Sequence, residues 1–356
     1  STAIDAALLQ AEMERRRALI VEPVGTGPIK GVWLYNGTAY CFRQAVGNNP
    51  DRMFKATAAG WTLISPPTRL QFNTGTAEPR EGETLTRSGV TSTIVRVARS
   101  GGSWSGGSAQ GYIHVRNIAG GSYTNGIATT ASGSLTLTDA PGDPIHLGQG
   151  TTYSFRNYSF TGGETDERMY FCSATIGQAA AIGGFGSYAL EFDGTSYSWI
   201  MTAHLIQSKW PTHVAVHGNH LWLAFEHGVV LYSSLGTPRE FIVAEDSGGI
   251  VFGQRATNMV DGAYSSLVIT GKDQVSYLTG SSGDDFVMKS IESDRGAKAQ
   301  SLVKVGPRPF YVDDGGIQQL ASSDSFGDWT VQAISVLVDP IFRTKKVHGI
   351  TCTASV

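Results

Sequence analysis

The sequence predicts an all-β protein with a propeller-like body, an inserted small Gly-rich β-domain and a short N-terminal α-helix. Three observations support this prediction: a strand-turn-strand phrase that recurs along the chain, abundant glycine and few charged residues. The chain has 356 residues, of which 44 are glycine, and only 16% are charged. High glycine and low charge without a proline excess are typical of turn-rich β-structure rather than of disorder.

The recurring phrase consists of an apolar strand, a tight turn of Gly with Asn or Asp, and a second apolar strand. Gly and Asn adopt the positive φ that two-residue turns need at little cost. Copies occupy residues 32–42, 190–197, 214–223 and 309–317, with a looser copy at 267–275. Repeats spaced by about 40 to 50 residues suit one four-stranded propeller blade each. The Trp-Asp and Gly-His signatures of the commonest propeller family are absent from the sequence.

One helix is predicted at the N-terminus, from Ile4 to about Leu19. Its first half is rich in good helix formers, and a narrow apolar stripe repeats at helical spacing. Asp5 lies near its start and three arginines lie near its end, which suits the helix macrodipole. We therefore expect this segment to be helical while the rest of the chain is β-structure.

Arg15, Arg16 and Arg17 form the densest basic cluster of the chain, and they have two interpretations. They can complement the helix dipole and pair with Glu12 and Glu14, which is the commoner role of such clusters. They can also make a non-specific contact with DNA, and no other segment of the sequence suggests one.

Changes in composition and in the strand-turn pattern along the sequence predict four segments. Residues 1–22 hold the helix, 23–80 a first propeller-like segment, 81–150 an inserted Gly/Ser-rich β-domain, and 151–356 a second propeller-like segment. The first segment ends with a strand at 61–64, and the insertion has short strands at 93–97, 111–115 and 134–138. The insertion has few large apolar residues, so we expect a thin core and mobility relative to the body. Residues 349–356 read as a strand cut off in mid-course, which predicts a longer gene product.

The net charge, the hydropathy and the cysteines of the chain indicate which partners and which redox environment to expect. The net charge of −3 gives no global basic field toward nucleic acid or an anionic membrane. No apolar run approaches the roughly 18 residues of a membrane span. Cys41, Cys172 and Cys352 lie far apart without a C-x-x-C pair, so we expect free thiols in strands and assembly in a reducing cytoplasm. A bridge between Cys41 and Cys172 is the alternative.

Five of the eight histidines fall within a short stretch. On a helix, His213, His217 and His220 would share a face, as metal ligands do. The Gly218-Asn219 pair and the flanking valines instead favour a hairpin, where two of them lie about 13 Å apart at strand rise. We therefore expect histidines that make structural hydrogen bonds or interface contacts. The full set is His204, His213, His217, His220 and His227.

Acidic residues beside glycine offer a second candidate chemistry. Paired carboxylates cleave glycosidic bonds, but Asp and Glu are also ordinary turn residues. No pair stands apart as acid and base, so turns are the preferred interpretation. The candidates are Glu164, Asp166, Glu167, Asp284, Asp285, Asp313 and Asp314. No Gly-x-Ser-x-Gly motif or phosphate loop precedes a helix. The sequence thus predicts no catalytic residue, no metal site and no cofactor.

The seven tryptophans are spread along the chain. Exposed Trp and Tyr form sugar-binding platforms, whereas aromatic residues in strands more often belong to a core. The core is the preferred interpretation here.

Several of these phrases resemble virion structural proteins of tailed bacteriophages. The resemblance lies in residues 216–225 with 228–241, 267–280, 296–297, 310–317 and 325–329. Residues 82–92 and 102–111 are similar to Gly-rich modules that recur in phage structural proteins. The resemblance extends over most of the chain from Gly31 to Arg343, but its motifs are turn and strand phrases rather than catalytic signatures.

The resemblance implies a subunit of the tail nozzle or neck of a short-tailed phage, built on a β-propeller. It implies a homo-oligomeric ring, six-fold in symmetry, around a channel through which duplex DNA passes without sequence recognition. The implied neighbours are an adaptor and fibres of the virion tail, assembled in the host bacterial cytoplasm. No catalytic residue carries over, so we expect no enzyme. The alternative is a host-surface glycan-binding virion protein, and a sugar-cleaving enzyme comes third.

Overall fold

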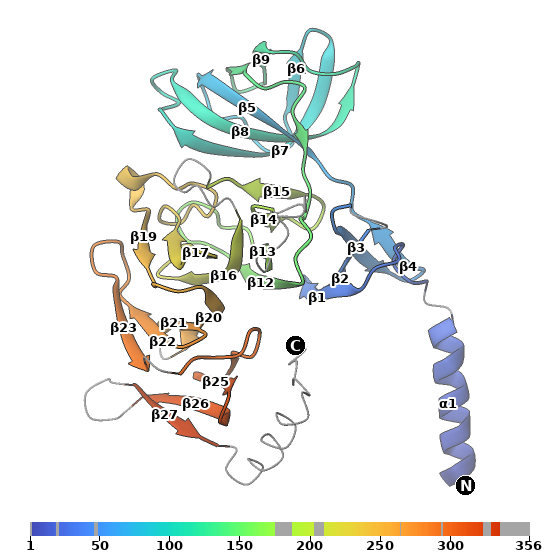
Figure 1. The fold of residues 1–356 in the computed structure, drawn as a ribbon. Helices are drawn as coiled ribbons and strands as arrows, with labels where there is room; N and C mark the ends of the chain where they lie inside the picture. Colours follow the sequence, from blue (N-terminus) through green and yellow to red (C-terminus); the bar gives the residue numbers. More distant parts are fainter. Residues whose placement is uncertain are drawn as a thin grey trace.

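The computed structural model describes residues 2–18, 21–45, 49–174, 187–202, 210–263, 265–292, 295–322 and 329–334. One helix, α1 (Thr2–Ala18), precedes the strands β1 to β27, and a short 3₁₀ turn lies at Val243–Glu245. Figure 1 shows a barrel-like domain above a stack of small sheets, with α1 standing apart from both. The expected fold class, all-β and propeller-like with an insertion and an N-terminal helix, is confirmed. The strand predicted at 349–356 lies outside the described residues, as do His204 and Cys352.

Five antiparallel sheets of four strands, each in sequence order, form the body, and we call them blades 1 to 5. Blade 1 contains β1 (Ile29–Tyr35), β2 (Thr38–Arg43), β3 (Arg52–Thr57) and β4 (Gly60–Leu63). Blade 2 contains β12 (Thr152–Tyr158), β13 (Arg168–Ala174), β14 (Ala189–Phe192) and β15 (Tyr197–Ile200). Blade 3 contains β16 (Pro211–His217), β17 (His220–Phe225), β18 (Val229–Tyr232) and β19 (Gly248–Val251). Blade 4 contains β20 (Ala256–Ala263), β21 (Ser266–Gly271), β22 (Val275–Thr279) and β23 (Val287–Glu292). Blade 5 contains β24 (Val303–Val305), β25 (Arg308–Asp313), β26 (Gly316–Ser322) and β27 (Trp329–Ala333).

The blades stack because strand side chains alternate between two faces, and both faces are apolar. Met169 and Phe171 of β13 pack toward blade 1, whereas Tyr170 and Cys172 pack toward blade 3. The same alternation gives one core between each pair of successive blades. The first strand of each blade lies against the first strand of the next, so these strands gather along a common axis.

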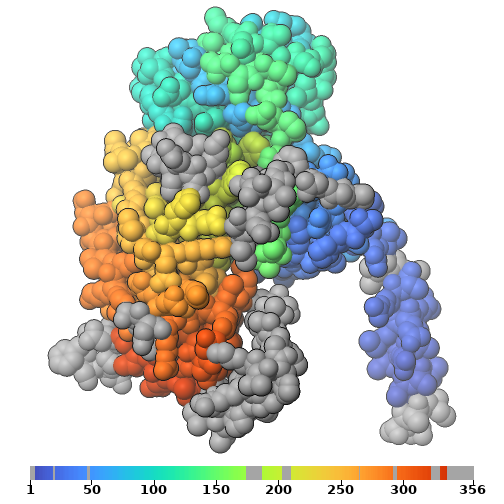
Figure 2. Space-filling view, viewed as in Figure 1, coloured from blue at the N-terminus to red at the C-terminus, as the bar shows by residue number. Residues whose placement is uncertain are grey.

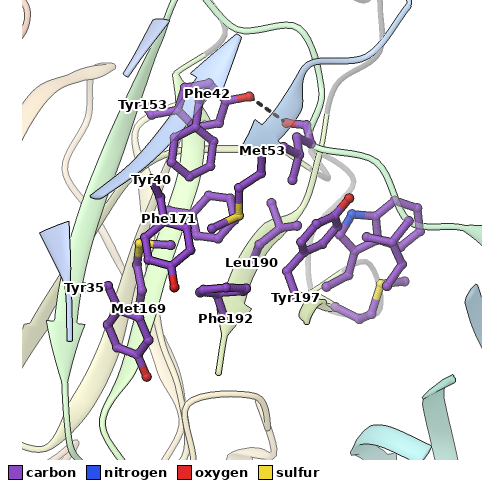
Figure 3. Packing of buried hydrophobic residues seen from close by; sticks show 14 residues of the cluster. Tyr35, Tyr40, Phe42, Met53, Tyr153, Met169, Phe171, Leu190, Phe192 and Tyr197 are labelled. Carbon is purple, nitrogen blue, oxygen red and sulfur yellow. Dashed lines mark hydrogen bonds between the residues drawn. The ribbon is translucent and has the colours of Figure 1, made fainter. Parts of the chain in front are cut away.

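Figure 3 shows the core between blades 1 and 2, which is built mainly from aromatic rings. Phe42 packs on Phe171 with ring centroids 5.1 Å apart, and Tyr40 meets the edge of Phe192 at 5.0 Å. Such pairs add specific geometry to the burial of large apolar area. Strand aromatics at this contact thus belong to a core, as the sequence predicted.

The hairpin phrase is confirmed at all five positions. Its copies are the hairpins β1–β2, β14–β15, β16–β17, β21–β22 and β25–β26. Asn36 and Gly37 turn with φ of 47° and 69°, as a tight hairpin requires. The copies do not occupy the same place in each blade. The repeated sequence pattern marks a tight turn between two strands, and such a turn can join any two successive strands of a blade.

The insertion is a closed six-stranded antiparallel barrel. Its strands are β5 (Thr68–Gly75), β6 (Thr84–Arg87), β7 (Val90–Gly101), β8 (Ala109–Ala119), β9 (Gly126–Thr129) and β10 (Ser134–Leu137), with β11 (Asp143–Pro144) on the edge of β5. Pairing of β10 with both β9 and β5 closes the barrel and leaves no free edge along it.

Two expectations for the insertion need correction. The boundary at residue 81 is too late, because β5 pairs with β8 and β10 and so belongs to the barrel rather than to blade 1. The core is also fuller than composition suggested, since closure packs small and medium residues into one buried cluster that includes Leu70, Phe72 and Ile113. Mobility of the barrel relative to the body stays a prediction.

A cluster of buried and partly buried charges, which we call the Arg–Glu junction, joins the barrel to blades 2 and 3. It consists of Arg96, Arg99, Arg168 and Arg239 with Glu81, Glu164, Glu191 and Glu240. Arg96 of β7 is 4% exposed, and its guanidinium binds Glu81, Glu164 and Glu191, the last of which is 3% exposed. Burial alone would raise the pKa of Glu191, but the charge and hydrogen bonds of Arg96, with the charges of Arg239 and Arg168, together outweigh it and hold that pKa at about 2.

We predict that Arg96→Leu lowers the free energy of unfolding by about 3–5 kcal/mol, because it leaves the buried carboxylates of Glu164 and Glu191 without their Arg96 counter-charge. Urea unfolding followed by fluorescence measures this change. The matched control is Arg116→Leu on the exposed surface of the same barrel, which we expect to cost less than about 0.5 kcal/mol. Equal losses for the two variants would show that the junction does not hold the barrel.

Candidate functional site

The predicted arginine cluster lies on the exposed last turn of α1. Arg15 Nε lies 2.7 Å from a Glu12 oxygen and Arg16 Nε lies 2.9 Å from the other. Hydrogen bonds from these two arginines lower the pKa of Glu12 to about 2. Glu14 instead accepts a hydrogen bond from the Gln10 amide at 3.1 Å. The cluster thus has the helix-end ion pairs of the first interpretation, while its guanidinium groups stay accessible to solvent.

The histidines occupy strands and turns, as the hairpin interpretation predicted. His217 on β16 contacts Gly280 O at 2.9 Å, and His220 on β17 contacts Ser233 O at 2.6 Å. His213 Nδ1 lies 3.0 Å from the Thr212 hydroxyl. The His217 and His220 rings therefore each join two chain segments, and the described part of the chain contains no group of acidic, His and Cys side chains suited to a metal ion.

The acidic candidates are bound into loops and turns. Asp285 accepts the amide protons of Ser281 and Ser282, and Asp313 accepts that of Gly315. Glu164 lies in the Arg–Glu junction, where Arg239 binds it at 2.9 Å. The contacts of Asp285 and Asp313 support the turn interpretation, and Glu164 is instead paired with arginine.

The structure brings together a pocket that the sequence did not reveal. It lies on the axis of the body, has a volume of about 580 Å³, and is lined by residues of β1, β12, β16 and β20 and by the segment before β24. We call it the axial pocket. The first strands of blades 1 to 4 contribute, together with the segment that leads into blade 5.

Stacked aromatic rings form one wall of the axial pocket. Trp33 and Phe155 lie 5.2 Å apart and nearly parallel, at 14°. The Trp33 indole donates to Asn157 Oδ1 at 2.8 Å, which fixes its plane. Gly31 permits this packing, because a Cβ at that position would lie 3.0 Å from the Phe155 ring. The wall is half-buried and held in one orientation.

Neutral polar groups lie around the rest of the axial pocket. Gln300 has a φ of 61°, which a side chain with a Cβ rarely adopts, and its amide lies 3.5 Å from His213 Nε2. Burial lowers the pKa of His213 to about 4, so its imidazole is neutral at pH 7. Asn258 is 5% exposed and donates to Lys298 O at 2.9 Å.

One charged side chain lines the axial pocket, and it is paired. Lys30 binds Asp51 at 2.8 Å, with side-chain exposures of 7% and 0%. Asp51 also accepts a hydrogen bond from the Tyr153 hydroxyl at 2.9 Å. The pocket therefore offers aromatic faces and neutral hydrogen-bonding groups without an unpaired charge.

Cys41 and Cys172 are free, buried thiols in β2 and β13. Burial raises the pKa of the Cys41 thiol to about 11 and raises that of Cys172 further, so both stay protonated. They match the expected free thiols in strands. None of the described helices is long and apolar enough to span a membrane.

Comparison with known proteins finds only distant likenesses. No protein-family model matches it, and no curated protein matches it. Similar solved structures include virginiamycin B lyase from Staphylococcus aureus, with 11% identity over 87% of this chain and 85% of the lyase and a TM-score of 0.34. BBS1N in complex with ARL6DN matches with 9% identity over 84% of this chain and 92% of that chain and a TM-score of 0.29. Likenesses this distant assign no activity.

Buried His114 of β8 gives a pH-dependent prediction. It lies between Arg69 and Arg96 on the neighbouring strands, is 0% exposed, and neither ring nitrogen has a hydrogen-bond partner in the described part of the chain. Burial lowers its pKa to about 3. The unfolded chain takes up a proton below about pH 6.5, so this group favours folding above that pH and opposes it increasingly toward pH 3.

We therefore predict that His114→Leu raises the Tm at pH 5 relative to the unsubstituted protein and leaves it equal or higher at pH 7.5, where only the unpaired nitrogens are removed. Thermal unfolding at the two pH values measures the difference. His227→Leu, at an exposed turn, is the control and should not change the pH dependence. A Tm that falls equally at both pH values would contradict this account.

Proposed function

We propose that this chain is a structural subunit of a bacteriophage tail or neck, a nozzle ring that encloses a conduit for genomic DNA during ejection. In this proposal the ring is homo-oligomeric and six-fold, contacts an adaptor and fibres, and belongs to the virion tail. The chain acts as a scaffold rather than as an enzyme. The proposal starts from the resemblance of its strand and turn phrases to phage virion proteins.

The roles of the reactive side chains support a scaffold. The acidic candidates close turns or pair with arginine, the histidines bind backbone carbonyls or a neighbouring hydroxyl, and both described thiols are buried. A catalytic site needs a nucleophile or base free to meet a substrate. Groups held in structural contacts favour assembly over chemistry.

The observation that carries the proposal is the projecting helix. Figure 2 shows α1 standing away from the body. Its apolar residues Leu8, Leu9 and Met13 are 65%, 64% and 63% exposed. A cluster of large exposed apolar side chains marks a surface that packs against another protein. We infer that α1 is an assembly arm, which in a ring contacts the next subunit head to tail.

The runner-up function is a host-surface glycan-binding virion protein. The axial pocket favours it, because an aromatic wall with neutral amides is suited to a sugar. The symmetry of the assembled oligomer distinguishes the two functions. A receptor-binding appendage is usually a trimer at the periphery of the virion, whereas a nozzle is a ring around an open axis.

We predict that the purified protein forms closed rings by mass photometry, and that Leu8→Gln, Leu9→Gln and Met13→Gln together reduce them to monomers. Glutamine keeps helix propensity while it removes the apolar surface. The control replaces Leu63 and Val251, which are 42% and 74% exposed in strands, with glutamine and should leave the ring intact. A trimer, or a monomer at all concentrations, would defeat the nozzle proposal.

A second prediction concerns DNA passage. Each neutralised phosphate adds affinity through counterion release, so a conduit needs a lining that binds DNA weakly. With a net charge of −3, we predict duplex DNA binding weaker than about 10⁻⁶ M at physiological salt, without sequence preference. Replacing Arg15, Arg16 and Arg17 with alanine should reduce it further in an anisotropy titration.

The control for this titration replaces Arg52, Arg116 and Arg308, three exposed arginines away from α1, with alanine. It removes the same charge and should change DNA binding less than the α1 variant does. Tight, sequence-dependent binding that survives loss of the α1 arginines would show that a DNA-recognition surface lies elsewhere.

A further inference from the structure

The axial pocket has the size of a small-molecule site. Its volume of about 580 Å³ falls within the roughly 300–1,000 Å³ typical of such sites. The first strands of blades 1 to 4 form most of its lining, and the segment before β24 completes it with Gln300 and Leu302. Trp33 and Phe155 on one wall and Met259 and Leu302 on others give it apolar surfaces.

The charges of the pocket restrict its ligand class. Lys30 is paired with Asp51, and His213 is neutral at pH 7. A charged ligand would lose water without gaining an opposite charge. A purely apolar ligand would displace water from the amides of Asn258 and Gln300 and the imidazole of His213 without replacing its hydrogen bonds, which costs free energy. The lining therefore favours a neutral ligand that has both apolar faces and many hydroxyl groups.

Sugars have this combination of surfaces. The C–H face of a pyranose packs on the electron-rich face of an aromatic ring, and its hydroxyls both donate and accept hydrogen bonds. Asn258 uses its amide nitrogen to bind Lys298 O, and among the described residues no donor reaches its Oδ1, which can accept from a hydroxyl. The Gln300 side-chain amide, whose nitrogen lies 3.5 Å from His213 Nε2, supplies a further neutral donor and acceptor, and His213 holds it at the wall.

Strain at Gln300 is a further sign of a functional role. Its φ of 61° is one that glycine adopts freely and glutamine does not. Seven other described non-glycine residues share a positive φ, so the strain supports a ligand role only together with the place of Gln300 at the pocket wall and its contact with His213. The Gln300 amide lies beside His213 at the wall of the pocket.

We propose that the axial pocket binds a neutral oligosaccharide, with the Trp33–Phe155 pair as the stacking platform and Gln300, Asn258 and His213 as the hydrogen-bonding groups. This site does not depend on ring formation, and its failure would leave the scaffold proposal intact.

The test is a titration of the full chain with maltose, lactose, cellobiose and N,N′-diacetylchitobiose, each up to about 50 mM, followed by tryptophan fluorescence and saturation-transfer NMR. We expect at least one disaccharide to bind in the millimolar range or tighter. Sialyllactose and indole are run in parallel as charged and apolar probes, and we expect both to bind more weakly than that disaccharide.

Two variants locate the site. Trp33→Ala should weaken binding about tenfold or more, whereas Trp61→Ala, on β4 outside the pocket, should leave it unchanged. Gln300→Gly is the sharper variant because glycine accepts the φ of this position. We expect it to keep or raise the Tm while it weakens binding, which loss of folding cannot explain.

Three outcomes would overturn the proposal. The first is no detectable binding of any of the four disaccharides. The second is binding that neither Trp33→Ala nor Gln300→Gly weakens. The third is preferential binding of sialyllactose or indole, which would assign the pocket to a charged or an apolar ligand instead.

Discussion

The structure depends on one constraint: a four-stranded sheet with apolar residues on both faces must be covered on both sides. Each inner blade meets this constraint by stacking between two others, which divides its alternating side chains between two cores. The end blades each have one face without a described neighbour. Val32 and Leu34 of blade 1 are accordingly 53% and 61% exposed, and Val303 and Val305 of blade 5 are 43% and 63% exposed. The axial pocket is a consequence of the same stacking, since convergent first strands enclose it.

The barrel is attached to this stack by charge in addition to shape. Buried ion pairs cost desolvation and give little net stability over apolar packing, but they tolerate few alternative arrangements. The Arg–Glu junction therefore determines how the barrel sits on blades 2 and 3 more than how stable the protein is. That property suits a scaffold, in which the orientation of domains matters for assembly.

The sequence predicted what local chemistry determines. The hairpin turns, the N-terminal helix and the ion pairs of Glu12 with Arg15 and Arg16 each depend on residues close together in the chain. It could not predict that Arg96 pairs with Glu191, because residues this far apart meet only through the fold. It assigned β5 to the body because the Gly/Ser-rich composition begins only near residue 81, and only pairing with β8 and β10 identifies β5 as barrel. The pocket was missed for the same reason: Trp33 and His213 come from different blades, Gln300 comes from the segment before β24, and no sequence signal reports the φ of Gln300.

The central claim is that the Arg–Glu junction holds the barrel on the stacked blades, in place of the mobility that composition predicted, while α1 extends from them. Hydrogen-deuterium exchange followed by mass spectrometry tests this claim most directly, because it reports the stability of each segment separately. The account predicts similarly slow exchange in β7, β8, β13, β17 and β21, with fast exchange in α1 when the protein is kept monomeric. Exchange of β7 and β8 well before β13, β17 and β21 would show that the barrel opens on its own, and would contradict this claim.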